Sequence, residues 1–121
     1  MKIAIIGSRE FKNKDLFMNE LIKRKYNLGE LQYEVNLSFI SGGAKGIDAW
    51  TKQFAELYNV PIEIIRPINP ANKLDYLFRN VEIITKANKI IAFWDGKSRG
   101  TKFVIDYAKA RGKEIEVIQN E

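Results

Sequence analysis

The sequence predicts a single α/β domain built around a parallel β-sheet. Short, branched apolar runs alternate along the chain with segments whose apolar residues recur at helical spacing. The 121 residues leave room for one compact domain, so we treat 1–121 as one unit. Alternating strands and helices are joined by right-handed crossovers, which place helices on both faces of a parallel sheet.

The first half of the chain contains two predicted strands and two predicted helices. Ile3–Ile6 is continuously apolar, as in a strand buried on both faces. A helix is predicted over about 14–25, with Asn13 as its N-cap, and 26–36 is left as a connection. Leu37–Ile40 predicts the second strand. The apolar face of the next helix is formed by Ile47, Trp50, Phe54 and Leu57.

The second half adds three strands and two helices. Ile62–Ile65 contains a glutamate, which favours an edge position, and Asn69-Pro70 predicts the N-cap and first residue of a helix. Lys89–Trp94 is apolar throughout its middle and is predicted to be central. Glu114–Ile118 alternates like an edge strand. The apolar stripes of the two helices are Leu74, Leu77, Phe78, Val81 and Ile84, and Phe103, Val104, Tyr107 and Ala108, the second helix ending at Gly112.

The polarity of these strands also predicts their order in the sheet. The third and fifth strands carry charged residues and belong at the edges, whereas the first and fourth are apolar and belong inside. We therefore predict a five-stranded parallel sheet in the order 3-2-1-4-5, within a Rossmann-like three-layer sandwich. Ligands of such sheets bind beyond the carboxyl ends of the strands at the topological switch point, here between strands one and four.

Composition excludes several classes of chemistry. The chain has no cysteine and no histidine, which excludes thiol nucleophiles, His-dependent triads and Cys- or His-ligated zinc, haem and iron–sulfur centres. The longest apolar run, Ile90–Trp94, is far too short to cross a bilayer, so we expect a cytoplasmic protein with no membrane partner. The net charge of +5 permits anionic partners. We interpret the basic triplet Lys23–Lys25 as a solvated helix end.

Three glycine-containing loops, 7–10, 41–48 and 94–101, follow the first, second and fourth strands. They should open at one edge of the sheet, where glycines let backbone N–H groups approach an anion at helix N-termini. Phosphate is the ligand that this pattern favours. The candidate ligand-binding residues are Gly7, Ser8, Arg9, Ser41, Gly42, Gly43, Ala44, Lys45, Gly46, Asp48, Arg79, Asn80, Trp94, Asp95, Gly96, Lys97, Ser98, Arg99, Gly100 and Thr101.

Several of these candidates have structural alternatives. Asp48 could hold a ribose hydroxyl or act as a base, or it could only complement the helix dipole. Asp95 could brace its own turn, which is the favoured reading, and Arg79 could face the rim or the solvent. Trp94 and Tyr76 could stack on a base, whereas Trp50 is expected to pack in the core or at a dimer contact.

Two familiar nucleotide motifs are absent. Gly96-Lys97-Ser98 has the end of a P-loop, but Ile91 stands where its first glycine is required. The dinucleotide fingerprint G-x-G-x-x-G follows neither the first nor the second strand. An ordinary NAD-dependent dehydrogenase is therefore disfavoured.

The loops together resemble the SLOG superfamily, which is named for Smf/DprA DNA-processing proteins and LOG hydrolases, and within it the small YspA-like branch. The resemblance implies a Rossmannoid domain that binds nucleotides or nucleotide-derived molecules. It covers nearly the whole chain and rests on Gly-Ser-Arg-x-Phe at 7–11, Ser-Gly-Gly-Ala-Lys-Gly-Ile-Asp at 41–48, Arg79-Asn80, and Phe-Trp-Asp-Gly-Lys-Ser-Arg-Gly-Thr at 93–101.

The hydrolase branch of that superfamily carries P-G-G-x-G-T-x-x-E, and this sequence departs from the motif. The loop 94–101 is two residues longer, and Val104 stands at the position of the catalytic glutamate. Arg79 matches the arginine that precedes the fourth strand in those hydrolases. Cleavage would need Asp48, Asp95 or Asp106 to replace the missing carboxylate, so the resemblance leaves enzymatic activity open.

Three functions follow as hypotheses. The leading one is binding of a phosphorylated ribose compound, such as a mononucleotide or an ADP-ribose derivative, by a sensor or sequestering protein. The first alternative is a nucleotide N-glycohydrolase that uses Asp48, Arg79 and Asp95, and the second is a single-stranded-DNA-binding accessory protein. The sequence requires no cofactor, leaves magnesium open, and permits a homodimer through the helix that carries Trp50.

Overall fold

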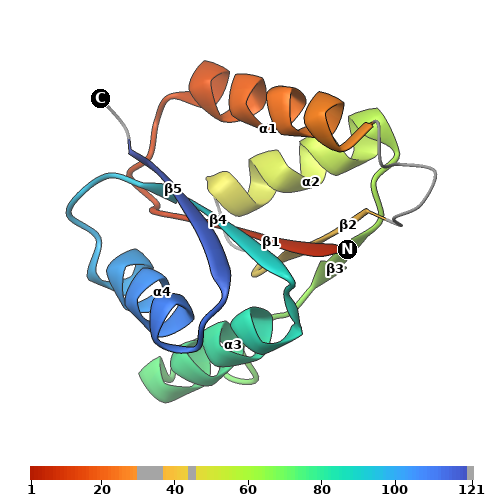
Figure 1. Cartoon of the computed structure of the whole chain (residues 1–121). Coiled ribbons are helices and arrows are strands. Elements are labelled where there is room, and N and C mark those ends of the chain that lie inside the picture. The colour runs from red at the N-terminus through yellow and green to blue at the C-terminus, as the bar shows by residue number, and fades with distance from the viewer. Residues whose placement is uncertain (30–36, 44–45, 120–121) are drawn as a thin grey trace.

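The computed structural model describes residues 1–29, 37–43 and 46–119. The elements alternate along the chain (Figure 1) as β1 (Lys2–Gly7), α1 (Lys14–Gly29), β2 (Ser38–Ser41), α2 (Ile47–Tyr58), β3 (Ile62–Ile64), α3 (Lys73–Lys86), β4 (Lys89–Trp94), α4 (Arg99–Ala110) and β5 (Glu114–Gln119). Within these ranges no helix is both long and apolar enough to span a bilayer.

The strands form one parallel sheet in the order β3-β2-β1-β4-β5, which confirms the predicted order. Helices α1 and α2 lie on one face of this sheet and α3 and α4 on the other (Figure 1), so the fold is a Rossmann-like three-layer sandwich. The central pair, β1 and β4, aligns Ile5 with Ile91, and both side chains are buried. The predicted edge strands, β3 and β5, do lie at the edges.

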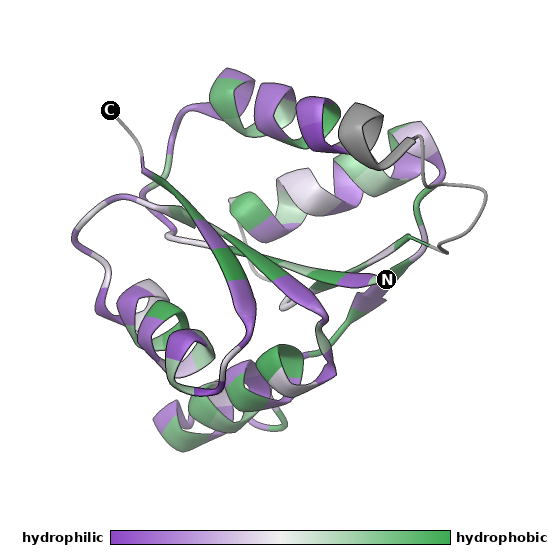
Figure 2. Cartoon of the chain, viewed as in Figure 1, coloured by the Kyte–Doolittle hydropathy of each residue, from purple (hydrophilic) through white to green (hydrophobic). Residues whose placement is uncertain are grey.

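Two apolar cores separate the three layers, because successive strand residues point to opposite faces. Ala4 and Ile6 of β1 join the core beneath α3 and α4, whereas Ile3 and Ile5 join the core beneath α1 and α2. Figure 2 shows hydrophobic residues along the strands and on the inner sides of the helices. The second core is aromatic, with the rings of Phe17 and Phe93 4.7 Å apart and that of Trp50 5.6 Å from Phe17. The core packing expected of Trp50 is confirmed.

The first residues of α1 and α3 are set by the asparagine side chains that cap these helices. The Asn13 side chain accepts a hydrogen bond from the Leu16 amide at 3.0 Å, which confirms it as the cap of α1. The predicted start of α3 at Asn69-Pro70 is wrong. Asn72 caps this helix by accepting from the Leu74 amide at 2.9 Å, whereas the Asn69 side chain holds a preceding turn.

Parts of the predicted apolar stripes are exposed. Leu57 is 72% exposed, Leu74 and Phe78 are 59% and 64% exposed, and Leu77 and Phe103 are 36% and 37% exposed, so these members of the predicted apolar stripes do not join the core. The buried residues of α3, Ile83 and Ile84, lie in its C-terminal half. Helix α2 buries Thr51 because its hydroxyl donates to the Ile47 carbonyl at 2.7 Å.

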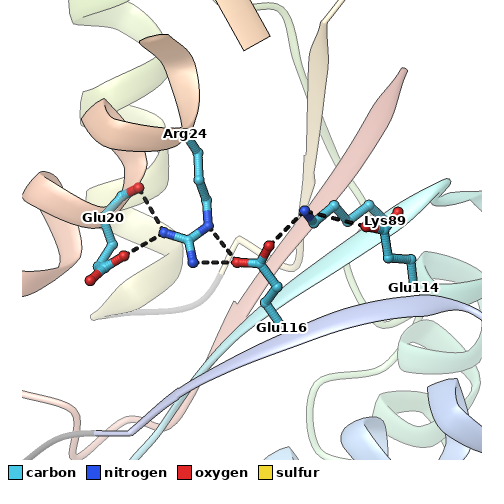
Figure 3. Close-up of polar contacts among 5 residues, drawn as sticks. All are labelled: Glu20, Arg24, Lys89, Glu114 and Glu116. Atoms are coloured by element: carbon cyan, nitrogen blue, oxygen red, sulfur yellow. Dashed lines mark hydrogen bonds and ion pairs between the residues drawn. The ribbon is translucent and has the colours of Figure 1, made fainter. Parts of the chain in front are cut away.

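The interpretation of Lys23–Lys25 as a solvated helix end is wrong for Arg24. Its guanidinium donates through Nε and Nη2 to Glu116 on β5 and through Nη1 to Glu20 at 2.5 Å (Figure 3). Lys89 Nζ lies 2.7 Å from Glu116 and 3.6 Å from Glu114. We call these five residues the edge ion network. It joins α1 to β4 and β5 on one face of the sheet.

Candidate functional site

A cavity of about 730 Å³ opens at the carboxyl ends of β1, β2 and β4. Its position follows from the topology, because the strand order reverses between β1 and β4 and the loops that follow these strands diverge there. Residues from all three glycine-containing loops and from α3 line it. The candidate residues that the structure brings together here are Gly7, Arg9, Gly42, Asp48, Arg79, Asn80, Asp95, Lys97, Ser98, Gly100 and Thr101.

The other candidates lie outside the lining. Ser8 and Ser41 are buried beneath the loops. Ala44 and Lys45 fall outside the described residues. The remaining described candidates, which do not line the cavity, are Gly43, Gly46, Trp94, Gly96 and Arg99.

The cavity also contains residues that the candidate set lacks. Two of them are Tyr76, which the sequence predicts only as a ring that could stack on a base, and Glu10, which follows Arg9 in the first loop. The apolar lining is formed by Ile6, Ile83 and Val104. Helical spacing could have identified two of these, because Ile83 lies four residues after Arg79 and Val104 three residues after Thr101, on the same helix faces.

Arg79 projects from α3 to the end of β2. Its Nη1 donates to the Gly42 carbonyl at 2.8 Å, and its Nε donates to the Asn80 side chain at 2.8 Å. Its guanidinium carbon lies 5.3 Å from the centre of the Tyr76 ring. Burial lowers the pKa of the Arg79 guanidinium, Asp48 opposes that shift, and Arg9 lowers the pKa further. The charge of Arg79 is therefore disfavoured by its surroundings while it faces an open cavity.

Gly42 permits the approach of Arg79. A Cβ atom at this position would overlap the guanidinium and would lie 3.2 Å from Oδ2 of Asp48. Only a glycine lets the Arg79 guanidinium and the Asp48 carboxylate both reach the end of β2. Glycine is therefore required at position 42 by the approach of the Arg79 and Asp48 side chains, and not by the backbone conformation of the turn.

Gly43, by contrast, faces away from the cavity. Its φ of +72° is in the left-handed region, and Arg66 donates to its carbonyl at 3.0 Å from the side of β3. Gly46, with φ +76°, is the N-cap residue of α2 and provides no side-chain capping bond. These two glycines shape the loop, and Gly42 alone among the described glycines of 41–48 contacts the cavity.

The β4–α4 loop is held by Asp95. Its Oδ1 accepts hydrogen bonds from the amides of Lys97 at 2.8 Å and Ser98 at 2.7 Å. The Ser98 and Lys97 amides are the main reason that the pKa of the Asp95 carboxyl is lowered, and the Ser8 hydroxyl contributes to the same shift. The prediction that Asp95 braces its turn is confirmed. A carboxylate that accepts two backbone hydrogen bonds and has a lowered pKa is a poor general base.

The loop delivers the N-terminus of α4 to the cavity. Ser98 caps the helix by accepting from the Thr101 amide at 3.4 Å. Among the described residues, none provides an acceptor for the backbone N–H groups of Arg99 and Gly100. Two amide donors and the positive end of the helix dipole thus face the region where Gly100 and Thr101 line the cavity.

Trp94 does not provide a stacking surface. Its indole Nε1 donates to the Ser98 carbonyl at 3.1 Å, and the ring packs against the core beneath α3 and α4. The aromatic ring that does line the cavity is Tyr76.

The lining combines three cationic side chains, Arg9, Arg79 and Lys97, with three carboxylates. Of the carboxylates, Asp95 binds its own loop, and Glu10 pairs with Lys12 at 3.6 Å. The described residues contain no cluster of three or more metal-ligating side chains. The arrangement is suited to holding an anion beside hydrogen-bond acceptors.

Comparison with known proteins assigns nothing to this site. No family model matches the chain, and no curated protein or solved structure matches it. The chemistry of the cavity must therefore be inferred from its own residues.

Proposed function

We propose that this protein binds a nucleotide or a nucleotide-derived phosphorylated ribose compound in the cavity, as a sensor or a sequestering protein. One observation carries the proposal. The guanidinium of Arg79 is partly buried, burial lowers its pKa although Asp48 opposes that shift, and it faces a cavity that α4 enters by its N-terminus. An anion bound there would offset the cost of burying that charge.

The anion subsite fits phosphate. The amides of Arg99 and Gly100 and the guanidinium of Arg79 provide donors from two directions, and a phosphate group has acceptors on every side. Lys97 and Arg9 add positive charge at the opening.

The rest of the cavity suits a sugar and a ring. The Asp48 carboxylate lines the wall beside Arg79 and would accept hydrogen bonds from sugar hydroxyls. Tyr76, Ile83 and Val104 provide apolar surface for the remainder of the ligand. A volume of about 730 Å³ lies within the range that is usual for sites of small molecules and cofactors.

The resemblance to the SLOG superfamily supports the same proposal. The motifs that carry it contribute Gly7 and Arg9, Gly42 and Asp48, and Gly100 and Thr101 to the cavity lining. We accordingly propose that the chain is a SLOG-type domain.

A second candidate function is hydrolysis of a nucleotide N-glycosidic bond. The observation that favours it is the Asp48 carboxylate in the cavity lining. Val104 lines the cavity where the resembling hydrolases carry glutamate, and Asp95 is committed to its turn. Asp48 is the remaining carboxylate beside Arg79 and would stabilise positive charge on the sugar. Incubation with each bound nucleotide, followed by chromatography for free base, tests this: no released base rejects hydrolysis and leaves binding intact.

The binding proposal is tested by thermal shift with nucleoside monophosphates and ADP-ribose. A ligand that binds the native state raises the melting temperature by mass action, so at least one compound should produce a saturable rise. Arg79→Met should weaken that ligand by about 10- to 100-fold, the effect of losing a charge-assisted hydrogen bond.

Arg111→Met is the matched control, because Arg111 also lies over a tyrosine ring, that of Tyr107 at 5.7 Å, but far from the cavity. It should leave the affinity unchanged. Absence of a shift with every compound, or equal weakening by both variants, would reject the proposal.

A further inference from the structure

Three hydroxyl groups lie in contact beneath the cavity. The hydroxyl oxygen of Thr101 is 3.1 Å from that of Ser8 and 3.3 Å from that of Ser98. Ser8 is 1% exposed and Thr101 is 6% exposed, so water has little access to these two hydroxyls, whereas Ser98 is only partly buried. Thr101 and Ser98 line the cavity, whereas Ser8 does not.

The hydrogens of these hydroxyls can be arranged in a small number of ways. Each hydroxyl has one hydrogen to donate and two lone pairs that accept. When both serines donate to Thr101, the Thr101 hydrogen is left without an acceptor among the described residues and is free to point into the cavity. When Thr101 donates to Ser8 instead, the Ser8 hydrogen must find another acceptor.

The Ser8 hydroxyl has a second neighbour in Asp95. The Ser8 oxygen already accepts from the Asp95 amide at 3.2 Å, so the serine lies against the β4–α4 turn. Its hydroxyl also acts on the Asp95 carboxylate, whose pKa it helps to lower. With the Asp95 amide on its oxygen, Ser8 directs its hydrogen to Thr101, and this bond leaves the Thr101 hydrogen available to a ligand.

We propose that Ser8 is a buried positioning residue, which by donating to Thr101 turns the Thr101 hydroxyl hydrogen toward an acceptor-only anionic group at the N-terminus of α4. The proposal rests on the proposed function only in requiring an anion at this end of the cavity. An anion selects the arrangement in which both serines donate to Thr101.

The test is a titration of the ¹⁵N-labelled protein with inorganic phosphate, followed through the amide signals of Gly100 and Thr101. Saturable shifts of both signals are expected in the unmodified protein. Thr101→Val, which replaces the hydroxyl by a methyl of similar size, should weaken phosphate by on the order of tenfold. Ser8→Ala should weaken it by roughly threefold, because Thr101 then loses one of the donors that orient it.

The double variant separates positioning from a structural effect. If Ser8 acts through the Thr101 hydroxyl, Ser8→Ala should cause no further loss in the Thr101→Val background. Equal loss in both backgrounds would overturn the proposal, as would an unchanged affinity in Ser8→Ala or the absence of shifts at Thr101. Should Ser8→Ala not fold, Ser8→Cys retains only a weak donor and should weaken phosphate relative to the unmodified protein, whereas an unchanged affinity would overturn the proposal.

Thr51→Val is the matched control. It removes a buried hydroxyl bond of the same kind, from Thr51 to the Ile47 carbonyl in α2, and should lower stability without changing phosphate affinity. The outcome is independent of the nucleotide screen. If the phosphate titration shows coupling between Ser8 and Thr101 but no nucleotide binds in the thermal-shift screen, the proposed function is rejected and the positioning role of Ser8 is retained.

Discussion

The cavity and the edge ion network both gather charged side chains from several elements, but they use those charges differently. In the edge ion network, Arg24 contacts Glu20 and Glu116, and Lys89 contacts Glu116 and Glu114 (Figure 3). In the cavity, the hydrogen bonds of Arg79 go to the neutral oxygens of Asn80, Gly42 and Ile65, while the Asp48 carboxylate nearby favours its charge. The cations of the edge network donate directly to carboxylates, whereas Arg79 has only a nearby carboxylate, so more of its charge is left to attract an anion.

This difference predicts opposite consequences for mutation. Removing an ion from the edge network should lower stability and leave ligand binding unchanged, because the network joins α1 to the edge strand β5, away from the residues that line the cavity. Changing the cavity cation or its surroundings should mainly lower affinity. Folding and binding are thus expected to be separable by position.

The largest effect is expected at Gly42. Gly42→Ala places a Cβ atom against the Arg79 guanidinium and 3.2 Å from Oδ2 of Asp48, so the arginine must leave its position. The affinity for the ligand found by thermal shift should fall by about 100-fold, measured by isothermal titration calorimetry. Gly112→Ala is the control, since φ at Gly112 is +71° and its strain lies at the end of α4, away from the cavity. It should cost about 1 kcal/mol of stability without loss of affinity. Retained affinity in Gly42→Ala would contradict the assigned position of Arg79.

The second prediction concerns the edge ion network. Arg24→Met should lower the free energy of unfolding by roughly 1–2 kcal/mol, because Glu116 and Glu20 lose a half-buried partner. Urea denaturation measures this change. Lys102→Met breaks an exposed pair, Lys102 with Asp106 at 2.8 Å, and should change stability by less than about 0.5 kcal/mol. Equal effects of the two variants, or weaker ligand binding in Arg24→Met, would remove the distinction between the two regions.

The smallest effect is a change in the pH dependence of stability. Hydrogen bonds from Lys89 and then Arg24 lower the pKa of Glu116 below its ordinary value of 4.5, although burial opposes them. A lowered carboxyl pKa contributes stability that is complete above pH 4.5 and is lost as the pH falls through the lowered value. Glu116→Gln should therefore be less stable than the unmodified protein at neutral pH, and the gap should close below pH 4.5. Urea denaturation at several pH values checks this, and a gap that stays constant would contradict it.

The sequence predicts the sheet better than the side chains above it. Strand order follows from the polarity of β3 and β5, because an edge strand exposes a face that a central strand buries. The exposure of Phe78 could not be predicted, since helical spacing does not reveal that only the C-terminal half of α3 contributes buried residues. The pairing of Arg24 with Glu116 joins residues 92 positions apart, and no local pattern marks it.

The candidate site shows the same division. Glycine-rich loops after β1, β2 and β4 could be placed at one edge of the sheet from topology alone. The sequence could not predict which glycine lines the cavity, because Gly42 and Gly43 differ only in the backbone conformation of a loop. Likewise, Ser8 and Ser98 have the same side chain, but burial beneath Thr101 separates Ser8 from the cavity.

The central claim is that the cavity recognises the anionic end of its ligand. Calorimetric titration with a nucleoside 5′-monophosphate and with the same nucleoside lacking the phosphate tests it most directly. The phosphate should increase affinity by at least about tenfold, and Arg79→Met should remove most of that increase. Equal affinities for the two compounds would contradict the claim, because they would show that neither Arg79 nor the N-terminus of α4 binds the phosphate.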